Sequence, residues 1–106
     1  MWAWPLWYNC YTFEVRFKYD RRKSQVLRAN PKRGIGFEEA QELWTHPYYE
    51  DHRSDNPEQF RAIGWARGML ISIIFEIRDD EEGEYYHLVT LWRSTKQEEK
   101  LYEQNT

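Results

Sequence analysis

Basic side chains are the residues of this sequence best suited to chemistry, and they concentrate in its first third. Eight Lys and Arg residues stand against two acidic residues between positions 14 and 33. Arginine and lysine bind phosphate oxygens, and they stabilise charge that develops on a phosphoryl centre without help from a metal ion. This segment therefore indicates a phosphate-binding surface, unless its cations form a solvated face that pairs with acidic segments elsewhere.

Acidic residues dominate two later stretches of the chain. Residues 38–58 carry seven acidic side chains and one basic one, and residues 76–84 carry six and one. The 106-residue chain has a net charge of only −3, so the total conceals this segregation. A basic lobe on an otherwise acidic protein is typical of a nucleic-acid-binding face, but charge alone does not distinguish binding from internal pairing.

Other classes of site find little support in the sequence. His46, His52 and His87 lack the spacing of metal ligands, so neither a metal site nor a cofactor is expected. The run Gly34-Ile35-Gly36 is not followed by the remainder of a nucleotide-binding fingerprint. The single cysteine, Cys10, fits a reducing compartment, so we expect a cytoplasmic protein. No apolar run is long enough to predict a membrane span.

The first half of the chain contains one predicted strand, two predicted helices and a loop. Apolar and charged residues alternate over residues 12–19, which indicates a half-buried strand. Asp20 is a suitable cap for a helix that runs toward Pro31, and Gly36 opens a second helix that ends at His46. Residues 46–59 are polar, acidic and proline-containing, which predicts a long, exposed and mobile loop.

The second half of the chain predicts three strands and a closing helix. The strands span residues 60–65, 69–78 and 85–92, and the middle one is apolar enough to be central in a sheet. A charged five-residue loop, 79–83, joins the last two strands. A capping box predicts the final helix, from about residue 94 to 103. The order β-α-α-β-β-β-α predicts an α+β sandwich with a mostly antiparallel sheet packed against helices.

A series of short motifs extends over about residues 15–103. In chain order the motifs are Phe17-Lys18-Tyr19-Asp20, Lys23-Ser24, Gly34-Ile35-Gly36-Phe37-Glu38-Glu39-Ala40, Ile63-Gly64, Gly68-Met69-Leu70, Val89-Thr90 and Arg93-Ser94-Thr95 with Glu98. This series resembles the BrnT family. BrnT proteins are ribonuclease toxins of type II toxin–antitoxin pairs with a RelE-like fold, and a BrnA antitoxin neutralises them. The resemblance implies one BrnT-like domain over residues 12–106, with the aromatic-rich residues 1–11 as an N-terminal extension outside it.

The resemblance also implies a reaction and the residues that perform it. The reaction is metal-independent cleavage of RNA, in which the ribose 2′-OH attacks the adjacent phosphate. Family position assigns catalysis to Lys23, Arg33 and Arg93. Further contacts to RNA are expected from Lys32, Arg61, Arg67 and Lys96. The implied partners are an RNA substrate and a BrnA-like antitoxin, with DNA reached only through the antitoxin and no contact with a membrane.

Each of these residues also has a simpler structural interpretation. Lys23 could be a solvated helix residue, and Arg93 could pair with Glu98 or with an acidic loop. His87 suits a hydrogen-bonded strand position as well as acid–base chemistry. Trp92 and Tyr86 could stack on bases, although aromatic residues of a sheet usually belong to the core.

Two departures from the family pattern leave a second function open. Lys32-Arg33 stands where relatives carry Lys-His, so a permanent cation replaces a proton-transferring histidine. Trp92 stands where relatives carry Arg, and Arg93 follows on the other face of the strand. The alternative is a relative without catalytic activity that binds RNA or protein. A third interpretation is a small interaction domain whose basic lobe meets an acidic protein.

Overall fold

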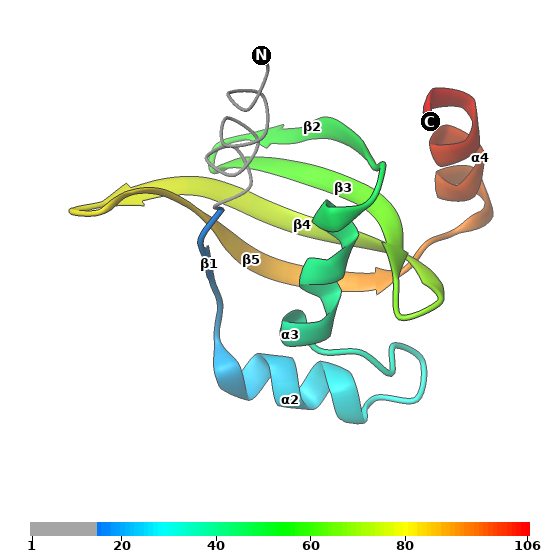
Figure 1. The fold of residues 1–106 in the computed structure, drawn as a ribbon, viewed down its shortest axis with the longest axis horizontal. Coiled ribbons are helices and arrows are strands. Elements are labelled where there is room, and N and C mark those ends of the chain that lie inside the picture. The colour runs from blue at the N-terminus through cyan, green and yellow to red at the C-terminus, as the bar shows by residue number, and fades with distance from the viewer. Residues whose placement is uncertain (1–14) are drawn as a thin grey trace, which may run out of the picture.

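A five-stranded sheet and three α-helices make up the part of the chain that the computed structural model describes, residues 15–106 (Figure 1). The strands are β1 (Phe17–Lys18), β2 (Tyr49–Asp55), β3 (Glu58–Ala66), β4 (Met69–Asp80) and β5 (Gly83–Arg93). The helices are α2 (Arg21–Ala29), α3 (Phe37–Ala40) and α4 (Lys96–Asn105), with a 3-10 helix, η1 (Gln41–Thr45), after α3. The predicted extension 1–11 and the start of the first predicted strand lie outside the described residues.

The sheet has the order β1-β5-β4-β3-β2. β1 runs parallel to β5, and the other three pairs of strands are antiparallel. The predicted α+β class with a mostly antiparallel sheet is therefore confirmed. β4 is the central strand, as its apolar sequence predicts, and Ile71 to Glu76 are all buried. Among the described residues, no helix is both long and apolar enough to cross a membrane.

The prediction of a long loop over residues 46–59 is wrong, because β2 occupies its middle. Within residues 15–106, β2 pairs only with β3, so it forms an edge of the described sheet. Edge strands commonly carry charged side chains, which discourage pairing with other molecules, and here Glu50, Asp51 and Arg53 hide the apolar alternation that would identify a strand. The element order therefore gains a strand before β3.

The predicted five-residue loop at 79–83 is also wrong. Asp80 pairs with Gly83, so only Glu81 and Glu82 connect β4 and β5. Gly83 has φ +111°, a backbone conformation that glycine adopts far more readily than other residues, and the Asp80 carboxylate accepts a hydrogen bond from the Glu82 backbone. These two features allow charged strand ends to close into a tight hairpin.

The predicted starts of the three helices are confirmed by their caps. The Asp20 carboxylate accepts hydrogen bonds from the backbone of Arg22 and Lys23 at the start of α2. Gly36 precedes α3, and Thr95 forms a capping box with Glu98 at the start of α4. The second predicted helix is present, but its second half is the 3-10 helix η1 rather than α-helix.

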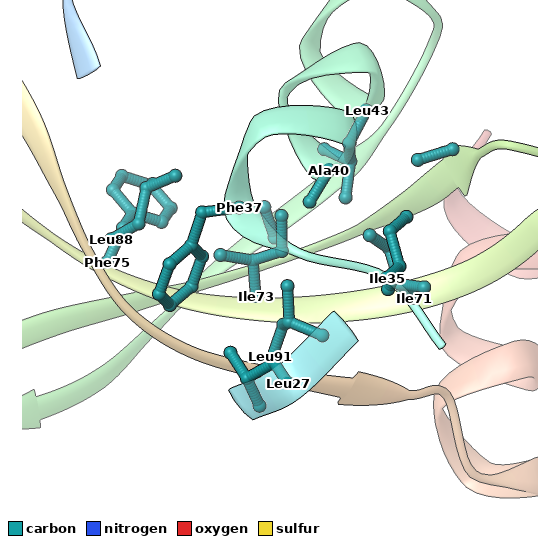
Figure 2. Packing of buried hydrophobic residues seen from close by; sticks show 12 residues of the cluster. Leu27, Ile35, Phe37, Ala40, Leu43, Ile71, Ile73, Phe75, Leu88 and Leu91 are labelled. Atoms are coloured by element: carbon teal, nitrogen blue, oxygen red, sulfur yellow. The ribbon is translucent and has the colours of Figure 1, made fainter. Parts of the chain in front are cut away.

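The main core lies between one face of the sheet and the segment α2, α3 and η1 (Figure 2). Leu27, Phe37 and Leu43 come from the helical segment and contact the apolar sheet face. The sheet residues of this core are Ala62, Ala66, Ile71, Ile73, Phe75, Leu88 and Leu91. Full burial of a side chain such as Phe37 contributes about 2 to 3 kcal/mol to folding, so this face fixes the position of α2 and the loop after it.

The end of β5 presents side chains to both faces of the sheet. Leu91 is buried in the main core, and because successive strand residues point to opposite faces, Trp92 points away from that core. The Trp92 indole contacts Glu98 of α4, which places the start of α4 on the second face. Figure 1 shows α4 apart from α2 and α3, at the end of the sheet where β5 stops. Arg93 is thereby directed back to the side of the core.

Candidate phosphate-binding site

Arg33 and Arg93, two of the predicted catalytic residues, lie together at the end of β5. The Arg33 Nε donates a hydrogen bond of 3.0 Å to the Leu91 carbonyl, and the Arg93 Nε donates one of 3.4 Å to the Arg33 carbonyl. A Cβ atom on Gly34 would lie 3.4 Å from the Arg93 Nη2. The side chain of Arg93 therefore lies against the backbone of the turn that carries Arg33.

The turn after α2 fixes the position of Arg33. The backbone N–H groups of Arg33 and Gly34 both donate to the Asn30 carbonyl, at 2.9 and 2.7 Å. Gly34 has φ +69°, in the left-handed region that a glycine adopts without strain. The Asn30 side chain accepts a further bond of 2.9 Å from the Lys32 backbone. A short, internally bonded turn thus directs Arg33 back to the sheet.

The arginine pair, Arg33 and Arg93, has free donors that suit an anion. Each guanidinium uses Nε to bind a main-chain carbonyl, and its two Nη groups form no hydrogen bond with residues 15–106. Neither side chain forms an ion pair within that range. Arginine Nη groups bind phosphate oxygens in pairs, so two neighbouring guanidinium groups without a carboxylate between them form a suitable phosphate site.

Arg93 does not form the ion pair with Glu98 that would give it a purely structural role. The Glu98 carboxylate accepts hydrogen bonds from the Trp92 indole at 3.0 Å, from the Thr95 backbone at 2.8 Å and from Arg61 at 3.3 Å. Glu98 is therefore occupied by groups other than Arg93. The charge of Arg93 remains available at the end of β5.

Three lysines predicted as site residues occupy different positions around the arginine pair. Lys32 precedes Arg33 in the same turn, and Lys96 is the first residue of α4, three positions after Arg93; both are exposed. Lys23 is exposed in the first turn of α2, so about 9 Å of helix separates it from the end that leads to Lys32. Lys32 and Lys96 are thus close to the arginines in the sequence, whereas Lys23 lies at the opposite end of α2 from the turn that carries Arg33.

Arg61 and Arg67, the remaining predicted contacts, are neutralised by carboxylates. The Arg61 Nη2 lies 2.5 Å from Asp51, its Nη1 lies 3.3 Å from Glu98, and its side chain is 17% exposed. The hydrogen bond with Asp51 raises the pKa of Arg61. The Arg67 Nε lies 3.2 Å from Glu42. These pairs make both arginines weaker candidates for phosphate than the arginine pair.

An open cleft on the second face of the sheet was not identified from the sequence. Its volume is about 740 Å³, and Trp92, Arg53, Arg61, Glu98 and Lys100 are among its lining residues. The Arg53 guanidinium lies over the Trp92 ring, 5.4 Å from its centroid. Sequence reasoning missed Arg53 because it lies in the segment predicted as a loop. The available signal was its place as the single basic residue in an acidic stretch.

A second hollow, of about 560 Å³, is unsuited to phosphate. It is lined by Val15, Phe17, Gln41, Trp44, Thr45, Tyr48 and Tyr86, none of which is charged. Tyr86 packs against Phe75, with ring centroids 4.6 Å apart, and against Trp44 at 5.6 Å. Of the two aromatic residues considered for base stacking, Tyr86 thus contributes to an aromatic cluster at the core, whereas Trp92 faces the open cleft.

His87 lies far from the arginine pair along β5, and His46 and His52 each lie beside a carboxylate. Burial lowers the pKa of His87, with a further contribution from Arg78, and six positions of β5, about 20 Å, separate it from Arg93. The His46 ring lies 3.4 Å from Glu42, and the His52 ring lies 3.4 Å from Glu58. Within residues 15–106 there is no group of three or more His, Cys, Asp or Glu side chains placed to hold a metal ion.

No protein-family model matches the chain, and a search of curated proteins finds no match.

Proposed function

We propose that this protein is a metal-independent endoribonuclease of the BrnT type, neutralised in the cytoplasm by a BrnA-like antitoxin. The observation that carries the proposal is the arginine pair, whose four Nη groups form no hydrogen bond with residues 15–106. In this cleavage the 2′-OH loses its proton to solvent and forms a bond to phosphorus, while the bond from phosphorus to the 5′-oxygen breaks and that oxygen takes up a proton, which leaves a 2′,3′-cyclic phosphate and a 5′-hydroxyl. The reaction passes through a phosphorane-like transition state with added negative charge. Fixed cations placed where that charge develops lower the barrier.

In the proposed reaction, the arginine pair binds the non-bridging oxygens of the scissile phosphate. Because each Nε is held by a main-chain carbonyl, the guanidinium planes are oriented before the substrate binds. Lys32 and Lys96, exposed on either side along the chain, contact the neighbouring phosphates. The pair therefore supplies charge stabilisation, and the lysines supply affinity for the RNA backbone.

The arrangement of the elements supports this proposal. Helices α2 and α3 follow the first strand, and α4 closes the chain. Packing of these helices against a mostly antiparallel sheet is compatible with a RelE-like fold. The resemblance to BrnT proteins adds the expectation of an antitoxin partner. The proposed protein therefore has a RelE-like topology and an antitoxin partner.

A relative that binds RNA without cleaving it is the second candidate. The observation that favours it is the absence of a histidine at the arginine pair among residues 15–106, since Arg33 cannot accept a proton at neutral pH. The same site would then hold a phosphate without activating the 2′-OH. The two candidate functions differ only in whether the bound RNA is cleaved.

Incubation of purified protein with total RNA in the presence of EDTA tests the proposal. We expect cleavage, and a decrease of about 100-fold in its rate in Arg33→Ala and in Arg93→Ala. Arg22→Ala, which removes an exposed cation from α2, is the matched control and should retain activity. Lys23→Ala in the same assay decides whether Lys23 has a catalytic role.

The outcomes separate the two candidates. Binding of RNA that stays intact would overturn the ribonuclease proposal and favour the binding protein. Equal loss of activity in Arg22→Ala and Arg93→Ala would show that total charge, and not the arginine pair, determines the activity. Circular dichroism of every variant verifies that the fold is retained.

A further inference from the structure

We propose that the cleft beside Trp92 is a stacking site for one base of single-stranded RNA. This inference rests on the proposed function for the identity of the ligand as RNA, and it assigns a site on the opposite face of the sheet from the arginine pair. The sequence is compatible with two roles for Trp92, as a core residue or as a residue that stacks on a base. Its surroundings support the second role by orientation, accessibility and charge.

The Trp92 indole is held in one orientation before any ligand binds. Its Nε1 donates to both carboxylate oxygens of Glu98, at 3.0 and 3.3 Å. Glu98 is itself only 5% exposed and is fixed by the Thr95 backbone and by Arg61. A stacking platform that is already ordered binds a base with little loss of side-chain entropy.

One face of the Trp92 ring is already covered by a planar cation. The Arg53 guanidinium lies 5.4 Å from the ring centroid, and Arg53 is exposed and forms no ion pair with residues 15–106. A guanidinium and a nucleobase occupy an indole face in the same way, by contact with its π system. Because Arg53 is tethered only at the edge strand β2, its side chain can swing outward to admit a base and then cover it.

The charge of the cleft suits a polyanion. Its lining includes two cations that form no ion pair with residues 15–106, Arg53 and Lys100, whereas the Arg61 and Glu98 side chains pair with each other. The volume of about 740 Å³ exceeds the needs of a single base, so the adjoining sugar and phosphate fit as well. In this proposal Arg53 covers the base, and Lys100 contacts the backbone of the strand that supplies it.

The end of β5 provides a path between the cleft and the arginine pair. β1 pairs only with Tyr86 and His87, so no strand borders the last part of β5 on that side within residues 15–106. The Leu91 carbonyl on this free edge accepts the hydrogen bond from Arg33. Trp92 and Arg93 are consecutive, with Cα atoms about 3.8 Å apart, and point to opposite faces. An RNA strand that crosses this edge places a phosphate at the arginine pair and a neighbouring base on Trp92.

Binding of uncleavable oligomers tests the stacking site independently of catalysis. Fluorescence anisotropy would compare a labelled 2′-O-methyl oligouridine with an abasic oligomer of the same length and charge. We expect the wild-type protein to bind the oligouridine roughly 10-fold more tightly, as the contribution of one stacked base predicts. Trp92→Leu should remove this preference, and Trp92→Phe, which keeps an aromatic face, should retain part of it.

The control variants separate this inference from the proposed function. Trp65→Leu removes an exposed tryptophan that does not line the cleft, and it should leave the preference unchanged. Arg93→Ala should weaken the binding of both oligomers by the same factor, because it acts on phosphate. Equal binding of the two oligomers to wild type, or an unchanged preference in Trp92→Leu, overturns the stacking site even if cleavage is observed. Failure of the wild type to bind either oligomer overturns both the inference and the proposed function.

Discussion

Glu98 connects three parts of the molecule through one buried carboxylate. It caps α4 at Thr95, accepts from the indole of Trp92 and pairs with Arg61 of β3. Burial by itself would raise the pKa of Glu98, but the Thr95 and Trp92 hydrogen bonds and the charge of Arg61 outweigh it, so the pKa is lowered. Its ionised form therefore stabilises the folded state.

We predict that Glu98→Gln lowers the free energy of unfolding by about 2 kcal/mol near neutral pH, because Arg61 loses a partly buried partner. A carboxyl group with a lowered pKa contributes stability above its ordinary value of 4.5 and loses it as the pH falls through the folded-state pKa. The difference between the variant and wild type should therefore shrink below pH 4.5. Urea unfolding at several pH values measures it, with the exposed Glu99→Gln as control. A constant difference across this range would contradict the prediction.

The short strand β1 depends on a carboxylate at the far end of β4. Asp80 lies 2.8 Å from Arg16 and 2.7 Å from Lys18, the two residues whose side chains flank Phe17. The hydrogen bonds from Arg16 and then from Lys18 hold the pKa of Asp80 well below its usual range. A strand of only two residues is thus anchored to the sheet by side chains as well as by backbone pairing.

We predict that Asp80→Asn loosens β1 without unfolding the rest of the sheet. The backbone N–H of Tyr86, which donates to the Arg16 carbonyl at 2.9 Å, should exchange with solvent faster in the variant. Asp79→Asn removes a neighbouring carboxylate that forms no ion pair within residues 15–106 and should leave this exchange unchanged. Because the pKa of Asp80 is lowered, protection in wild type should persist when the pH falls below 3.8 and decrease only in stronger acid. Equal exchange in the two variants would argue against the anchor.

β3 and η1 pack too closely for a side chain at Gly64. A Cβ atom there would lie 2.9 Å from the Leu43 Cγ and 3.2 Å from the Tyr48 Cβ. We predict that Gly64→Ala lowers the free energy of unfolding by about 1 to 3 kcal/mol through this overpacking. Leu43→Ala removes the obstructing atom, so the double variant should be more stable than the sum of the single effects implies. Thermal unfolding of the four proteins measures this coupling, and additive effects would contradict it.

Local signals explain which elements could be predicted from the sequence. Asp20 and Thr95 cap helices through contacts within three residues. The apolar run of β4 is by itself enough to predict that this strand is buried. β2 could not be predicted because an edge strand needs no apolar face. The meeting of Arg33 with Arg93 joins residues 60 positions apart, so only the resemblance to a family pointed to both of them. Arg53 was missed because its role depends on the position of β2.

At the scale of the whole molecule, the basic lobe at residues 14–33 divides into two sets. Arg16, Lys18 and Arg28 form ion pairs that attach β1 to the hairpin and α2 to α3. The other cations of the lobe, which form no ion pair within residues 15–106, are Arg21, Arg22, Lys23, Lys32 and Arg33. Internal pairing with acidic segments therefore explains the first set, and phosphate binding remains the explanation for the second. The second set, together with Arg93, is the one that a polyanion could reach.

The salt dependence of RNA binding should report how much of this charge contacts phosphate. Each cation that neutralises a phosphate of a single strand adds about 0.7 to the slope of log K against log salt concentration. Arg33→Ala combined with Arg93→Ala should therefore lower the slope by about 1.4. Arg21→Ala combined with Arg22→Ala removes the same charge from exposed positions on α2 and should lower it by less. Titration of 2′-O-methyl oligouridine at several salt concentrations measures both slopes. Equal changes in the two double variants would mean that the molecule attracts RNA through its overall basic lobe, with no preferred contact at the end of β5.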